Sequence, residues 1–334
     1  MLKKTKVKEK KNPFTPLMWI LLAILIIYAA SLFYLLLWTV ITSFKVNQDV
    51  YELDRYGFFI NYNKYYNSWG TERDVDLLMR AAFDKARKEG ALFLYTFRHM
   101  VQDFKMPTDP MPGQPAKTVS ILGMYGYTLL YAGGCALTAT VVPCITAYAC
   151  ARFNYKFSKL IHTVVIVVMM IPIVGSLPSE IEMARSLNIL NTMWGLWIMK
   201  ANFLGLYFLV FYDIFKSLPV SFSEAAKMDG ANNWRIFLQI ALPLIKNTFF
   251  TVLLIKFITF WNDYQSPKIF MPSFPTIANG LHFVMNENAK EGSIHTEVPA
   301  RMAMVILTAL PITTLFMIFQ KRLLGNLTMG GVKG

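Results

Sequence analysis

Long apolar stretches, each of the length needed to cross a bilayer, alternate with polar segments along this chain. A helix that spans the hydrocarbon core needs roughly 20 apolar residues. The stretches that meet this length are residues 16–43, 119–151, 160–178, 191–215, 247–264 and 300–319. Lysines precede the first stretch as in a secretion signal, but its apolar run continues to Trp38 and exceeds the roughly 7–15 residues of a cleaved signal. The pattern predicts an all-α membrane protein with six transmembrane helices, the first of them uncleaved.

The short polar segments differ in charge. Residues 1–15, the loops at 152–159 and 217–246 and the tail at 322–334 are basic, whereas the loop at 180–188 holds two acids and one arginine. Short loops rich in lysine and arginine stay on the cytoplasmic side of a membrane. This distribution predicts that the N-terminus and the C-terminus are both cytoplasmic.

The segment at 44–117, between the first two spans, is long, polar and rich in tyrosine. It is too long to be a bare connection, so we expect a small extracellular or periplasmic cap with helices around residues 74–87 and 93–104. A second outer loop is expected at 266–298. Residues 118–321 then form the predicted membrane core of five further helices.

Composition agrees with a membrane protein and narrows its partners. The chain of 334 residues is 55% hydrophobic and only 16% charged, and its formal net charge is +13. The mean hydropathy is +0.40 and the pI is about 9.5. A soluble chain is about 25% charged. Because the basic residues gather in the cytoplasmic segments, they are explained by membrane orientation, and we expect no nucleic-acid partner.

Motifs for metal binding or catalysis are missing from the sequence. The cysteines, Cys135, Cys144 and Cys150, lie in one apolar stretch without C-x-x-C spacing, and the histidines are scattered without an H-E-x-x-H motif. No phosphate-binding G-x-x-x-x-G-K-[ST] loop and no G-x-S-x-G elbow occurs. We therefore expect no metal, no cofactor and no catalytic residue, and we interpret the cysteines as small packing residues.

The cytoplasmic loop from Ser217 to Leu244 has a strong local pattern. Ser221 followed by Glu224 reads as a capping box at the start of a helix. Gly230 fits the left-handed position that ends a helix. A second helix, over residues 232–241, should follow and meet Pro243 near its end. The residues alone allow either an amphipathic connector on the bilayer surface or a docking surface for another protein.

This loop also resembles a known family. Its pattern is similar to the "EAA" loop of permease subunits in bacterial binding-protein-dependent type I ABC importers, and the matching residues are Glu224, Ala225, Ala226, Asp229, Gly230, Ile240, Leu242 and Pro243. The run from Trp261 to Pro267 and the glycine-rich tail resemble the second permease of maltose-type carbohydrate importers. The resemblance covers about residues 119–334 and leaves out the long segment before them. One position departs from the family pattern. The family has a glycine before the run Leu190-Asn191-Thr192, whereas in this chain the glycine is displaced and Asn188 lies nearby.

The resemblance implies a function and a set of partners. The chain would be a multi-pass protein of the bacterial cell membrane that forms half of the pathway of a carbohydrate importer. ATP would be bound and hydrolysed by two separate ATPase subunits. A second, related permease and an extracellular or periplasmic solute-binding protein would complete the complex.

Roles for single residues follow from the same resemblance. Coupling to the ATPase would involve Glu224, Ala225, Ala226, Asp229, Gly230 and Pro243, and the tail residues that would contact the ATPase are Gly331, Lys333 and Gly334. A tail rich in glycine could equally be a disordered end.

Two lysines lie at mid-depth in the predicted spans: Lys200 in the fourth and Lys256 in the fifth. A lysine at that depth costs roughly 2.5–3.5 kcal/mol on insertion scales, so it usually faces a cavity or a partner. We expect the two lysines to favour an anionic saccharide, such as a uronate-containing oligosaccharide. Alternatively, each pairs with an internal acid or carbonyl, or extends to the interface. Other candidate pathway residues are Asn202, Trp261, Asn262 and Asp263.

Functions of other classes fit the sequence less well. A secondary transporter would have coupling acids within its spans and usually two related halves, and few mid-span acids and no clear repeat are found. A membrane enzyme would need a catalytic cluster, and a scaffold would not need the pattern from Glu224 to Pro243. Within importers, an amino-acid or peptide permease is the alternative to a carbohydrate permease.

Overall fold

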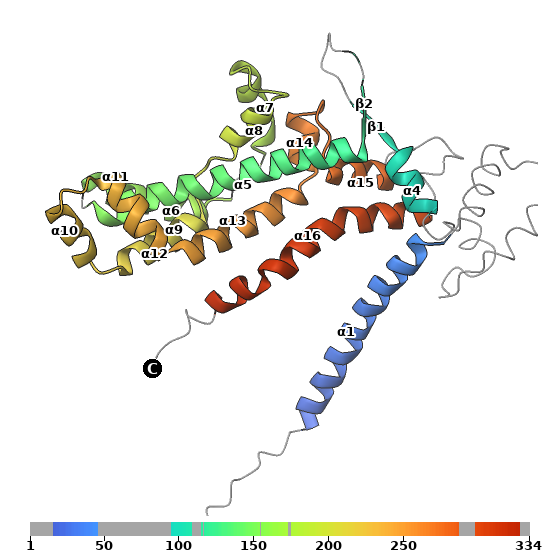
Figure 1. Cartoon of the computed structure of the whole chain (residues 1–334), viewed down its shortest axis with the longest axis horizontal. Helices are drawn as coiled ribbons and strands as arrows, with labels where there is room; N and C mark the ends of the chain where they lie inside the picture. The colour runs from blue at the N-terminus through green and yellow to red at the C-terminus, as the bar shows by residue number, and fades with distance from the viewer. Residues whose placement is uncertain are drawn as a thin grey trace, which may run out of the picture. The chain divides into compact units, whose positions relative to one another are not determined.

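A computed structural model of the chain describes residues 16–45, 95–108, 115, 117–153, 155–172, 175–286 and 298–327 (Figure 1). These residues are mainly helical and contain one two-stranded antiparallel sheet. The chain divides into two compact units, Met1–Thr96 and Phe97–Gly334. Several predictions fall outside the described residues: the basic segment 1–15, most of the cap at 44–117 with its helix at 74–87, and the tail residues Gly331, Lys333 and Gly334.

Helix α1 (Pro16–Ser43) agrees with the first predicted span residue for residue. It carries no charged side chain, and the side chains from Met18 to Leu37 are exposed around the whole helix. A helix that is apolar on every side suits lipid as its solvent.

Helices of spanning length support a multi-pass protein. In the described ranges, three helical segments are long and apolar enough to cross a membrane: Met18–Ser43, Ile121–Arg152 (α5) and Val298–Gln320 within α16 (Val298–Leu327). A fourth crossing arises if Asn233–Leu244 and Lys246–Trp261 (α13), which are bent by 79°, count as one. The total of six spans and the side on which each terminus lies stay predictions.

Helix α5 lies at the centre of the second unit. It packs most extensively against α13 and α9 (Leu206–Ser217), and Figure 1 shows α13 between α5 and α16. Small buried residues of α5 allow this close approach; they are Ala132, Cys135, Ala136, Ala139 and Ala147. All three cysteines are buried and unbridged, in agreement with a packing role.

A short helix, α8 (Met193–Met199), also packs on α5. The indole N–H of Trp197 donates to the carbonyl of Leu130 at 3.2 Å. A Cβ atom at Gly134 would overlap the Trp197 ring, so this position needs a residue without a side chain. The Trp197 ring therefore fixes α8 against the middle of α5.

Two predicted spans differ from the structure. The stretch at 160–178 contains α6 (Lys156–Met170), which ends at Ile171, and then a separate α7 (Leu177–Ser186). Ile171 is extended, with φ −86° and ψ 119°, because the following Pro172 disfavours helical backbone in the residue before it. The stretch at 191–215 is not one helix, because residues 200–205 between α8 and α9 are not helical.

The other end of the second unit contains short elements. Helix α4 (Tyr95–Gln102) begins at the unit boundary and confirms the helix expected over 93–104. β1 (Lys105–Pro107) pairs with β2 (Thr118–Ser120), with Lys105 opposite Ser120. Helices α14 (Gln265–Phe270) and α15 (Ile277–Asn286) occupy the segment between α13 and α16. The predicted second outer loop, 266–298, is thus partly helical.

Asn188 occupies the helix-ending position near which the family has its glycine. It has φ 54°, and α7 ends there with the amide of Ile189 donating to the carbonyl of Ala184 at 3.0 Å. Asparagine tolerates this left-handed backbone better than most residues. Asn188 therefore performs the helix-ending role for which a glycine would otherwise be expected.

Candidate functional site

The loop at 217–246, here called the arm, leaves the membrane core as a bent series of short helices. Figure 1 shows the arm at the end of the second unit opposite α15 and the sheet. Its elements are α10 (Ser221–Met228), α11 (Asn233–Ile236), the π-helical turn η3 (Phe237–Ala241) and α12 (Leu242–Leu244). The predicted order of a helix, a tight turn and a second helix is confirmed.

The start of α10 differs from the prediction. Val220 is the N-cap residue, and Ser221 is already inside the helix, so the capping box between Ser221 and Glu224 does not form. The physical reason is that Val220 has helical angles, φ −67° and ψ −27°, which start the helix one residue early. Among the described residues, the carboxylate of Glu224 has no hydrogen bond or ion pair, and the residue is exposed. Glu224 is therefore available to a partner.

The end of α10 agrees with the prediction for Gly230. Its φ is 78°. The amide of Gly230 donates to the carbonyl of Lys227 at 3.0 Å, and the amide of Ala231 donates to the carbonyl of Ala226 at 2.9 Å. These two bonds form a Schellman motif, in which the left-handed residue is usually glycine. Gly230 thus fixes the direction in which the chain leaves α10.

The surface of the arm carries apolar side chains that the chain itself does not cover. Met228 is 88% exposed, Trp234 61% and Phe222 51%. Beside them Ala225 and Asp229 are exposed, and Ala226 is nearly buried. Exposed methionine and aromatic residues next to small residues are typical of a surface that binds another protein.

The arm is tied to the membrane core by residues that the sequence analysis did not single out. The guanidinium of Arg152, at the end of α5, donates to the carbonyl of Leu218 at 3.0 Å. The ring of Tyr148 lies 5.2 Å from that of Phe215 and 4.8 Å from that of Phe237. These contacts join α5, α9 and η3, and they connect the arm to the core helices.

The return from the arm to α13 is bent. In η3 the amide of Leu242 donates to the carbonyl of Phe237, five residues earlier. Pro243 has no amide hydrogen and cannot extend the ordinary helical pattern. The amide of Ile245 is shared between the carbonyls of Ala241 and Leu242, and the chain then turns by 79° into α13. Pro243, predicted as part of the coupling loop, therefore lies next to the bend.

The break at 200–205 places two predicted pathway residues in non-helical backbone. Lys200 is the C-cap of α8, where its amide donates to the carbonyl of Leu196 at 2.9 Å. The side-chain oxygen of Asn202, an exposed residue, accepts from the amide of Leu204 at 2.8 Å. Non-helical backbone at membrane depth is tolerated only inside protein or beside water. Since the sequence predicts this segment at membrane depth, we expect the break to line either a protein interface or an aqueous path.

Lys256 lies on α13 and faces α9. Its ammonium group is 4.7 Å from the ring centroid of Tyr207, and its charge and that of Lys200 repel each other. The ion pairs between described residues are His99–Asp103 and Glu182–Arg185, and neither includes Lys200 or Lys256. The alternative that an internal acid of this chain neutralises each lysine is thus not met within the described ranges.

The run from Trp261 to Asp263 is involved mainly in contacts within the chain. Trp261 is 2% exposed, and its indole N–H donates to the carbonyl of Thr308 in α16 at 3.1 Å. The Asp263 carboxylate accepts from the hydroxyl of Tyr131 at 2.8 Å and from the amide of Ser266 at 3.0 Å. Asn262 is exposed and donates to the carbonyl of Ile258. Of these three predicted pathway residues, Asn262 is the one that is open to a solute in this conformation.

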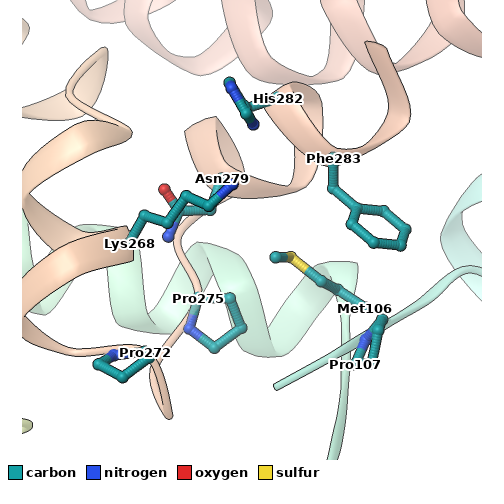
Figure 2. A pocket seen from close by; sticks show the side chains of 8 residues that line it. All are labelled: Met106, Pro107, Lys268, Pro272, Pro275, Asn279, His282 and Phe283. Carbon is teal, nitrogen blue, oxygen red and sulfur yellow. The ribbon is translucent and has the colours of Figure 1, made fainter. Parts of the chain in front are cut away.

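A small hollow, shown in Figure 2, is lined by residues of β1, α14, α15 and the chain between these two helices, which lie at the end of the second unit opposite the arm (Figure 1). The side chain of Asn279 is almost fully buried at its edge, and its carbonyl oxygen has no hydrogen-bond partner. The ring of His282 is stacked on that of Tyr264 at 4.4 Å. The volume of about 40 Å³ holds a few water molecules but no sugar ring. The lining residues are Met106, Pro107, Lys268, Pro272, Pro275, Asn279, His282 and Phe283.

Metal binding has no structural support in the described part of the chain, where no group of three or more histidine, cysteine or acidic side chains is placed to hold an ion. The expectation of no cofactor stays a prediction.

Comparison with protein families assigns more than half of the chain. Residues 139–327 match the family described as "Binding-protein-dependent transport system inner membrane component". The match includes the arm, the break and both lysines.

Similar proteins are permeases of sugar transport systems. The chain is 29% identical over 198 residues to the sulfoquinovosyl glycerol transport system permease protein SmoH of Agrobacterium fabrum, which covers 58% of this chain and 67% of that protein. It is 31% identical over 210 residues to the maltodextrin transport system permease protein MalD of Streptococcus pneumoniae, covering 58% and 69%.

A solved structure has the same fold. It is a bacterial ABC transporter involved in the import of the acidic polysaccharide alginate, and the matched chain has a TM-score of 0.62 and 20% sequence identity. The alignment covers 91% of this chain and 96% of that chain. It therefore extends beyond the region matched by the family.

Proposed function

Because the chain belongs to the family of binding-protein-dependent transport system inner membrane components, we propose that it is a permease subunit of an ATP-driven carbohydrate importer. It is a multi-pass protein of the cytoplasmic membrane and a transport component, not an enzyme. Its solutes are oligosaccharides, uronate-containing ones included. Support for a carbohydrate comes from the sugar permeases to which the chain is similar, and support for an acidic one comes from the fold shared with the alginate transporter.

The partners in this proposal are two ATPase subunits, a second permease related to this chain and a solute-binding protein outside the membrane. The two permeases line the path of the solute between them. ATP is bound by the ATPase subunits alone. The separate ATPase is supported by the lack of any phosphate-binding loop motif in this sequence.

The arm carries the proposal. Helix α10 presents Phe222, Met228 and the carboxylate of Glu224 to a partner, and the contacts of Arg152 and Phe237 tie the arm to α5 and α9. A rigid helix that docks on an ATPase transmits its closure as a movement of the attached spans. The apolar side chains supply the affinity for the ATPase, and Glu224 pairs with a basic group on it.

The test is co-purification from native membranes, followed by transport in vesicles. The wild-type chain should be recovered with an ATPase subunit whose hydrolysis is stimulated by a saccharide together with its binding protein. Glu224→Lys reverses the charge on the docking surface and should remove the ATPase subunit and saccharide uptake together. Glu182→Lys makes the same charge change on exposed α7 and should change neither.

Two results would contradict the proposal. Recovery of the chain without any ATPase, with uptake that does not need ATP, would favour a secondary transporter. Stimulation by amino acids or peptides instead of saccharides would keep the importer and replace its solute class.

A further inference from the structure

The break and the two lysines lie in one region of the membrane core, although they come from separate segments of the chain. Lys200 begins the break, and Tyr207 lies in the first turn of α9 just after it. The ammonium group of Lys256, from α13, is 4.7 Å from the centre of the Tyr207 ring. The charges of Lys200 and Lys256 repel each other. The Lys256 ammonium therefore lies beside the first turn of α9, directly after the break that Lys200 begins.

The backbone adds to this positive potential. Helix α9 begins at Leu206 after Gly205, without a side-chain cap. The first N–H groups of a helix have no partner within it, and their dipoles make that end positive. The start of α9 therefore faces the break with the same sign of charge as the lysines.

Asp263, which follows α13, does not balance these charges. Its two oxygens accept hydrogen bonds from the hydroxyl of Tyr131 and the amide of Ser266. In the described ranges no carboxylate is within ion-pair distance of either lysine, and an ionisable residue inside a membrane usually faces a water-filled cavity or a partner.

We propose that this region is the subsite that holds the carboxylate of an acidic saccharide during its passage, with Lys200 and Lys256 as its counter-charges. The inference rests on the proposed function, because it requires that the solute is a saccharide. Asn202, exposed within the break, donates from its side-chain amide to sugar oxygens. The ring of Tyr207 holds the Lys256 ammonium in place through a cation–π contact. When the carboxylate of the saccharide lies between the two lysines, its attraction to both ammonium groups offsets their mutual repulsion.

The experiment uses the complete transporter, with its ATPase subunits, second permease and binding protein, in vesicles that contain ATP. Uptake of labelled trigalacturonate and of labelled maltotriose is measured below saturation for the wild type and for Lys200→Met and Lys256→Met. Each substitution should lower trigalacturonate uptake by about tenfold or more, because a desolvated charge loses its partner, and should change maltotriose uptake less than about twofold.

Two further variants control for folding and for charge in general. Lys256→Arg retains the positive charge and should restore most of the trigalacturonate uptake. Lys159→Met removes an exposed lysine at the start of α6 and should leave both uptakes unchanged. ATPase activity of the assembled complex verifies that each variant folds and assembles.

The outcomes separate the two proposals. Equal loss of both saccharides in the lysine variants, or no loss of trigalacturonate uptake, would overturn the carboxylate subsite. So would a wild type that imports maltotriose and rejects trigalacturonate, and in that case the carbohydrate importer would stand. Uptake of neither saccharide by a complex with active ATPase would count against the proposed carbohydrate function itself.

Discussion

Two sets of polar side chains lie inside the membrane core, and they differ in what satisfies them. Trp261 and Asp263 at the end of α13 are bound to α16, α5 and the start of α14 through their own hydrogen bonds. Lys200 and Lys256 have no such partner in the ranges that the structure describes, and their charges repel each other. The comparison teaches that polar residues of one membrane core serve two purposes. Paired ones hold helices together, and the unpaired ones are those that we propose receive a solute.

Substitution of Trp261 by alanine should have the largest effect on stability. It removes a large side chain that is 2% exposed, together with its hydrogen bond to Thr308. Burial losses of this kind cost about 3–5 kcal/mol, and thermal unfolding of the purified complex in detergent measures the effect. Trp194→Ala, at a residue 48% exposed on α8, is the matched control. Similar melting temperatures for both variants would show that Trp261 is not a structural tie.

Asp263→Ala should have an intermediate effect. It leaves the hydroxyl of Tyr131, a residue with no exposed surface, without its acceptor. An unsatisfied buried group of this kind costs roughly 1–3 kcal/mol. Tyr131→Phe removes the other partner, and the double variant should be less destabilised than the sum of the two single variants. Strict additivity of the three unfolding free energies would mean that the pair does not interact.

Lys256→Met should have the smallest effect and the opposite sign. The substitution removes an interior charge that costs roughly 2.5–3.5 kcal/mol on insertion scales and gives up a cation–π contact with Tyr207 worth about 0.5–2 kcal/mol. The net expectation is a gain of about 0.5–3 kcal/mol in the unfolding free energy, measured by the same thermal assay, while transport of acidic solute is lost. A clear loss of stability would place Lys256 with Trp261 and Asp263 as a structural residue.

The sequence predicted best what depends on local composition. The bounds of α1 and the start of α13 followed from long apolar runs with polar ends, and the left-handed Gly230 followed from its place after a short helix-forming run. The non-helical break at 200–205 was not predicted, because hydropathy reports how apolar a segment is and not whether it is helical. Its signals were present in Asn202 and Gly205, which disfavour a continuous helix.

Roles that depend on tertiary contacts could not be predicted. Trp261 was predicted to be a pathway residue, and its hydrogen bond to Thr308 could not be foreseen because that acceptor is on another helix. Arg152 and Tyr207 were not singled out, since their partners Leu218 and Lys256 lie far along the chain. The capping box at Ser221 was wrong because the helix begins one residue earlier than its motif implies.

The shortness of α8 bears on how the chain is inserted into the bilayer during synthesis. Its seven residues rise only about 10 Å, a third of a hydrocarbon core roughly 30 Å thick. By itself, α8 is therefore too short to be recognised as a membrane segment when it emerges from the ribosome. Helix α5 is made earlier, and the missing side chain at Gly134 leaves the space that the Trp197 ring occupies. Because α5 is synthesised before α8, we expect α8 to pack on an α5 that is already in the membrane.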